Sequence, residues 1–70
     1  MTNEMSRSEI LKEKLILLQT EHRDLDGAIS SMEEALRPDI LALKRLKKKK
    51  LHLKDEIARI EDELTPDIIA

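Results

Sequence analysis

The chain has 70 residues, of which 40% are apolar and 40% are charged, and it contains no Phe, Tyr, Trp or Cys. The lack of cysteine excludes disulfides, thiol catalysis and thiolate metal sites, and a single glycine is typical of long helices rather than of a sheet. A net charge of −2 does not by itself indicate a nucleic-acid partner. So short a chain cannot bury a large core, and self-association is therefore expected.

The first helix is predicted to begin at Ser6, after a polar leader that we expect to be flexible. Ser6 and Glu9 have the spacing of a capping box. We interpret His22 as a structural residue, hydrogen-bonded at the edge of the core. Seam residues follow in alternating steps of four and three, as in a coiled coil: Leu11, Leu15, Leu18, His22, Leu25, Ile29, Met32 and Leu36.

A proline separates this segment from a second one with the same spacing. Pro38 is unfavourable inside a helix but suits the first helical position, so a turn is predicted at residues 36–39. Thr65 and Pro66 are predicted to end the second helix. The seam residues of this helix are Leu43, Leu46, Lys50, Leu53, Ile57, Ile60 and Leu64.

Charges beside the seam predict how the helices are oriented. One heptad frame runs through Pro38, so a continuous helix that dimerises is the alternative to a hairpin. A parallel dimer would oppose like charges, whereas an antiparallel arrangement pairs Glu33 with Lys47 and Asp26 with Lys47 and Lys54. We therefore predict an all-α antiparallel helical hairpin of coiled-coil type, whose facing residue numbers sum to about 75. A swapped antiparallel dimer would keep the same pairs. The predicted parts are a flexible leader at 1–5, a hairpin at 6–65 with helices at about 6–35 and 39–64, and an apolar tail at 66–70.

Residues that carry chemistry are scarce. The chain has no Gly-rich loop and no cluster of histidines and cysteines, so we expect no catalytic residue, no metal site and no cofactor. Gly27 is interpreted as a tolerated glycine on the helix surface. A hairpin of two helices also rarely forms the concave pocket that an enzyme needs.

A basic run in the second helix is the first candidate binding site. Six of the seven residues 44–50 are Lys or Arg. Several are expected to pair with acidic residues of the first helix, which leaves Lys44, Arg45 and Lys48 as a patch for an anionic ligand. Because aromatic stacking groups are absent, a solvated, ion-paired face is favoured over nucleic-acid binding.

Apolar residues outside the seam are the second candidate site. Ile10, Ile16 and Leu17 cannot be buried against the second helix of a hairpin. The tail residues Ile68 and Ile69 should emerge at the same end of the molecule. We predict that the two groups form an interface between chains, in preference to a tail that folds back, and thus a homo-oligomer whose other protein partners are unknown.

Three stretches carry a resemblance to a known family: EHRDLD at 21–26, LKKKKLHLKDEIARI at 46–60 and PDIIA at 66–70. Over roughly residues 9–70 the chain resembles the YdcH-like family of short bacterial helical proteins of unknown function. The resemblance implies a helical hairpin and brings no established activity, substrate or catalytic residue.

The longest apolar runs, such as Leu15–Leu18, are far shorter than the roughly 20 residues of a membrane span, so we expect a cytoplasmic protein with no membrane partner. The predicted function is a non-enzymatic structural or protein-interaction module that self-associates. The alternative is binding of nucleic acid or another anionic surface through the basic face of the second helix.

Overall fold

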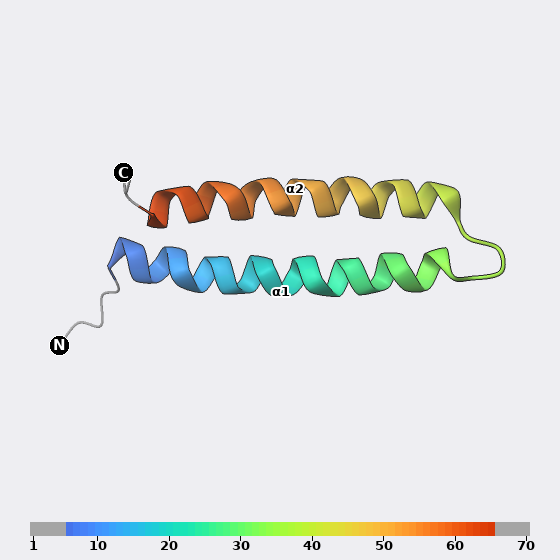
Figure 1. Ribbon diagram of the computed structural model, residues 1–70, viewed down its shortest axis with the longest axis horizontal. Helices are drawn as coiled ribbons and strands as arrows, with labels where there is room; N and C mark the ends of the chain where they lie inside the picture. The colour runs from blue at the N-terminus through green and yellow to red at the C-terminus, as the bar shows by residue number, and fades with distance from the viewer. Residues whose placement is uncertain (1–5, 66–70) are drawn as a thin grey trace.

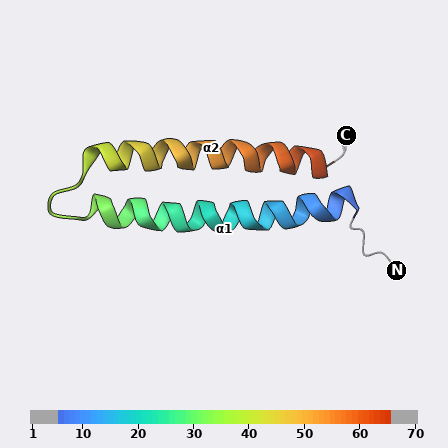
Figure 2. The same ribbon diagram turned by 180° about the vertical axis from the view of Figure 1, so that it is seen from behind.

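The computed structural model describes residues 6–65, which form two helices joined by one connection (Figure 1). Helix α1 spans Arg7–Glu33 and helix α2 spans Ile40–Leu64. The helices lie side by side and run in opposite directions in both views (Figure 1, Figure 2). The predicted all-α antiparallel hairpin is therefore confirmed. The predicted leader at 1–5 and tail at 66–70 lie outside the described residues.

The N-terminus of α1 is held by the predicted capping box. The Ser6 hydroxyl accepts a hydrogen bond from the Glu9 backbone N–H at 3.2 Å, and the Glu9 carboxylate accepts one from the Ser6 backbone N–H at 3.2 Å. The second of these bonds lowers the pKa of the Glu9 carboxyl below its ordinary value, since it favours the charged form. The helix ends at Glu33, two residues before the predicted end, and Glu34 is its C-cap.

The connection occupies residues 34–39 and is longer than the predicted turn at 36–39. Pro38 lies in the connection, as predicted. Asp39 is the N-cap of α2, because its carboxylate accepts a hydrogen bond from the Ala42 backbone N–H at 3.1 Å, and Pro38 precedes that cap. The fixed φ and missing N–H of Pro38 are as acceptable in the connection as they would be in the first turn of a helix.

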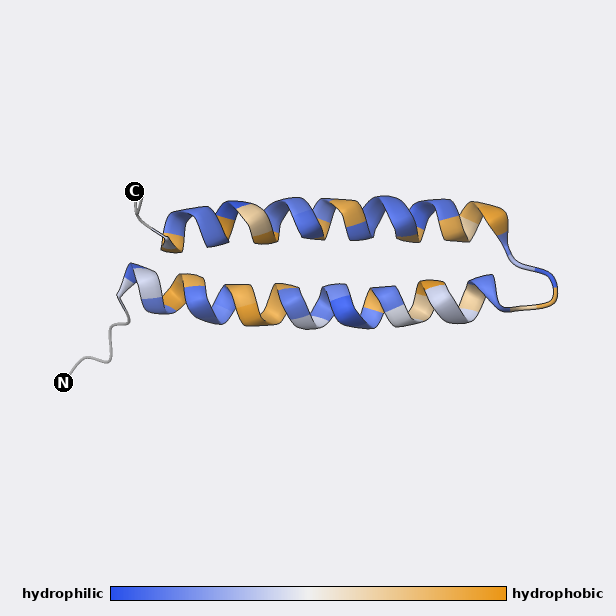
Figure 3. Ribbon diagram, viewed as in Figure 1, coloured by the Kyte–Doolittle hydropathy of each residue, from blue (hydrophilic) through white to orange (hydrophobic). Residues whose placement is uncertain are grey.

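The predicted seam forms the core wherever it lies within a helix. Figure 3 shows apolar segments along the facing sides of α1 and α2. Leu36 is the exception: it continues the heptad frame, but its side chain is 97% exposed because α1 has already ended. The remaining seam positions are half-buried or buried. Among residues 6–65, five are buried, all of them on the seam: Leu18, Ile29, Leu43, Leu53 and Ile60.

Ion pairs across the seam confirm the antiparallel register. Lys47 contacts Glu33 at 2.8 Å, as predicted, and Arg7 contacts Glu63 at 2.7 Å. Asp26 pairs with Lys50 at 2.5 Å rather than with the predicted Lys47 or Lys54. The residue numbers of these three pairs sum to 80, 76 and 70, around the predicted 75. Such exposed pairs add only some tenths of a kcal/mol each, so they select the orientation more than they stabilise the fold.

Candidate functional site

The side of α2 turned away from α1 carries the predicted anionic-ligand patch. Lys44, Arg45 and Lys48 are spaced three and four residues apart, which places them on one face of the helix, and all three are exposed. The same spacing extends the face in both directions. We call the whole set the outer stripe of α2; its members, in order, are Leu41, Lys44, Arg45, Lys48, Leu51 and His52.

The cations of the outer stripe differ from Lys47 and Lys50 of the basic run. Lys47 and Lys50 lie toward α1 and pair with acidic residues there. Lys44, Arg45 and Lys48 make no ion pair within residues 6–65. Whether these three residues bind a ligand stays a prediction.

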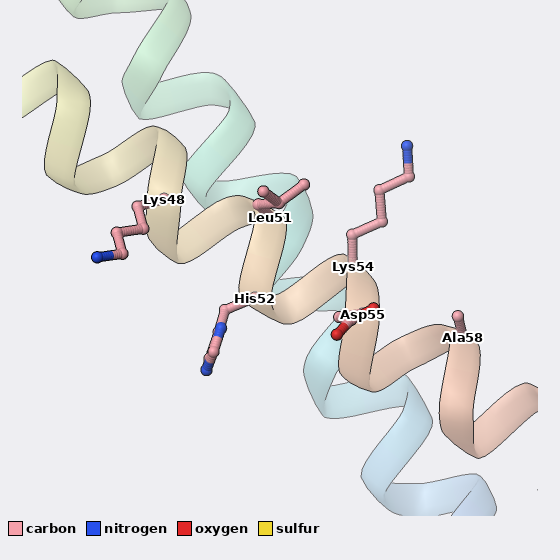
Figure 4. Close-up of a pocket in the computed structure, with 6 residues that line it drawn as sticks. All are labelled: Lys48, Leu51, His52, Lys54, Asp55 and Ala58. Atoms are coloured by element: carbon pink, nitrogen blue, oxygen red, sulfur yellow. The ribbon is translucent and has the colours of Figure 1, made fainter.

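Two leucines of the outer stripe were not among the predicted site residues. Leu41 is 67% exposed and Leu51 is 68% exposed, although both are large aliphatic side chains. Figure 4 views α2 from outside, with α1 behind it, and shows Leu51 on this side of the helix between Lys48 and Lys54. Their exposure could have been predicted from the sequence, because neither leucine occupies a seam position of the heptad frame.

A second group of exposed aliphatic residues lies on α1. Ile10, Ile16 and Leu17 are 52%, 62% and 65% exposed, as predicted from their positions outside the seam. We call these three residues the α1 apolar patch. They leave α1 on its outer side and therefore point away from α2. The predicted tail partners, Ile68 and Ile69, lie outside the described residues.

His22 occupies the seam but does not make the hydrogen bond we expected of it at Nε2. The residue is half-buried, and its Nε2 atom is buried without a hydrogen-bond partner among the described residues. An unsatisfied buried nitrogen costs free energy that a satisfied one does not. His22 is therefore a polar intrusion into the core, and its neighbour Asp26 bonds Lys50 instead.

Lys50 contributes the other polar group of the seam. Its ammonium contacts the Asp26 carboxylate. The hydrogen bond that Lys50 donates, followed by its positive charge, lowers the pKa of the Asp26 carboxyl. The pair keeps a charge at the seam beside the imidazole of His22, and a polar group at such a position fits a role in fixing the register of the helices.

Metal ligands and hollows were sought among the described residues. No group of three or more His, Cys, Asp and Glu side chains within residues 6–65 is placed to hold a metal ion. The hollow along α2 in Figure 4 is lined by Lys48, Leu51, His52, Lys54, Asp55 and Ala58 and is open to solvent. Neither of the two described helices is long and apolar enough to cross a membrane.

These features define a two-helix hairpin of coiled-coil type with two exposed surfaces of different character. A family model for the DUF465 proteins, described as proteins of unknown function, matches residues 15–61. The chain belongs to this DUF465 family. Comparisons with curated proteins and with solved structures found no match. The matched segment includes most of both seams and the basic run, but it begins after Ile10 and Leu11 and ends before Leu64.

Proposed function

We propose that the protein is a YdcH-like, non-enzymatic structural or protein-interaction module of the bacterial cytoplasm that acts as a self-associated hairpin. One observation carries the proposal: the α1 apolar patch exposes three large aliphatic side chains on a molecule whose own core is thin. Only five residues of the described chain are buried. Covering the patch with a second copy would enlarge the apolar core that one seam provides.

The chemistry of the patch favours a second copy of this chain over an anionic partner. Between Ile10 and Leu17, this face carries the charged residues Glu13 and Lys14, one of each sign. A surface of this kind is apolar and close to neutral, so it is complementary to itself. A two-fold dimer brings the same patch together from both chains.

Sedimentation equilibrium of the full chain tests the proposal. Ile10, Ile16 and Leu17 changed together to Gln are expected to shift the protein toward monomer, while the helicity stays near that of the wild type because all three side chains are exposed. The matched control changes Leu41 and Leu51 to Gln, which removes equally exposed leucines from α2 and should leave the association unaltered. A wild-type chain that is already monomeric at high concentration would refute the proposal.

A second candidate function is binding of nucleic acid or another anionic surface by the basic face of α2. It is supported by Lys44, Arg45 and Lys48, which are exposed and make no ion pair within the described residues. Binding to duplex DNA would weaken steeply between about 50 and 200 mM salt, since each neutralised phosphate releases a counterion. A polarisation titration at the two salt concentrations tests it, and affinity that is insensitive to salt would count against this function.

A further inference from the structure

We propose that the outer stripe of α2 docks on the surface of an anionic lipid bilayer. This inference rests on the second candidate function, and it selects a bilayer over nucleic acid as the anionic partner. It depends on the combination of free cations with exposed leucines on one helix face. The expectation of no membrane partner followed from the lack of a spanning segment, which docking on a surface does not require.

Leucines flank the three cations of the outer stripe. Leu41 and Leu51 are ten residues apart, which corresponds to roughly 15 Å along a helix. Lys44, Arg45 and Lys48 lie between them on the same face. A helix that lies in a bilayer interface uses both kinds of side chain, because its aliphatic groups enter the acyl boundary while its cations meet the lipid headgroups. Phosphates of a nucleic acid would attract the cations but would give the leucines no apolar partner.

The turn end of the hairpin continues the apolar part of this surface. Leu36 in the connection is 97% exposed, and Ile40 in the first turn of α2 is 59% exposed. Both are close in sequence to Leu41, where the outer stripe begins. Four large aliphatic side chains, Leu51 included, are therefore exposed on α2 and its preceding connection, where the basic run also lies.

The uneven distribution of charge allows a chain of net charge −2 to approach an anionic surface. Residues 44–50 contain six basic residues and no acidic one, whereas residues 55–63 contain five acidic residues and one basic one. The nearest of these acids, Asp55, is paired with Arg59 at 3.7 Å. The next acidic residue on the same face of α2 is Asp62, seven residues after Asp55. It is roughly 21 Å along the helix from Lys48, more than twice the Debye length of about 8 Å in physiological salt. The outer stripe therefore behaves as a locally positive surface.

Vesicle co-sedimentation of the full chain tests the inference, with phosphatidylglycerol and phosphatidylcholine mixed in equal amounts and pure phosphatidylcholine as the neutral control. The wild type is expected to bind the mixed vesicles and not the neutral ones. Changing Lys44, Arg45 and Lys48 to Gln should weaken binding about a hundredfold, at about fivefold per cation. A charge-matched control, Lys12, Lys14 and Arg23 changed to Gln, removes three exposed cations from α1 and should change binding only a few-fold.

The leucines distinguish a bilayer from other anionic partners. Leu41 and Leu51 changed to Ser should weaken vesicle binding about tenfold or more, because two aliphatic side chains no longer enter the interface, and should leave any DNA binding unchanged. Equal vesicle binding by the leucine variant, or equal losses from the two charge variants, would overturn the inference. Binding to duplex DNA without binding to vesicles would overturn it while retaining the second candidate function. A protein that binds neither DNA nor vesicles would refute both the inference and the second candidate function.

Discussion

The unsatisfied imidazole in the seam gives the sharpest test of the core. The Nε2 atom of His22 is buried without a hydrogen-bond partner among the described residues, at a position flanked along the seam by Leu18 and Leu25. Changing His22 to Leu removes a buried nitrogen whose lack of a partner costs about 1–3 kcal/mol, and it replaces the ring with a side chain that matches its neighbours. The free energy of unfolding should rise by about 1–3 kcal/mol.

Thermal and urea unfolding followed by circular dichroism measure this gain. For a chain of this size a change of 1 kcal/mol shifts the midpoint by roughly 4–8 °C, so the shift is well resolved. Protein concentration must be kept equal between variants, because self-association would make the midpoint depend on it. His52 is exposed on α2, and His52→Leu, which makes the same chemical change, should stay within about 0.5 kcal/mol of the wild type.

Two results would refute this reasoning. If His22→Leu is no more stable than the wild type, the buried nitrogen carries no cost, and water or a second copy of the chain satisfies it. If His52→Leu raises the midpoint as much as His22→Leu, the gain comes from helix propensity and not from the seam.

Three further changes have expected outcomes. Gly27→Ala should stabilise the hairpin by about 1 kcal/mol in urea unfolding, because a Cβ there meets no atom within 4 Å; an unchanged midpoint would contradict this. Leu53→Ala should cost about 2–5 kcal/mol, whereas Leu51→Ala should change stability by about 0.5 kcal/mol or less, since only Leu53 is buried; equal losses in thermal melts would refute the assigned seam. The lowered pKa of Asp26 contributes stability above its unfolded value of about 4, and this contribution is lost as the pH falls through the folded value. The midpoint of thermal unfolding should therefore fall less for Lys50→Met than for the wild type between about pH 5 and pH 2. An equal fall would contradict a stabilising Asp26–Lys50 pair.

Sequence periodicity was sufficient to predict the core because only one apolar stripe, the seam, runs the whole length of each helix. Every seam residue within α1 and α2 is half-buried or buried, and the capping box at Ser6 begins the first helix. These features depend on residues close together in the chain. Local chemistry therefore determined them before any contact between the helices had to be considered.

The connection was harder to predict because the heptad frame continues through it. Leu36 keeps the seven-residue spacing, so the pattern alone assigns it to the core, although the helix has already ended at Glu33. Two local features favour the observed boundaries. The residue before a proline is disfavoured in helical conformation, and an Asp after the proline is a strong N-cap. Periodicity describes which face a residue would occupy and not whether the helix reaches it.

Partner choice among the charged side chains was predictable in sign but only partly in detail. Glu33 pairs with Lys47 as predicted, but Asp26 takes Lys50 in place of Lys47 or Lys54. Long side chains one turn apart can reach the same carboxylate, and the alternatives differ by only some tenths of a kcal/mol. The free cations of the outer stripe were predictable, whereas the exposed leucines beside them required attention to residues outside the seam.

The two proposed surfaces have a joint geometric consequence. The α1 apolar patch points away from α2, and the outer stripe of α2 points away from α1. A dimer that packs α1 against α1 would place its two outer stripes on opposite sides of the assembly. One flat bilayer can then contact only one of the two outer stripes, so dimerisation adds no avidity for a single bilayer. The second outer stripe can instead bind another vesicle, so the dimer can join two vesicles. Wild-type protein should therefore raise the turbidity of mixed anionic vesicles. The variant with Ile10, Ile16 and Leu17 changed to Gln should bind with similar affinity per chain and cause no turbidity, and clustering by that variant would show that the dimer is arranged differently.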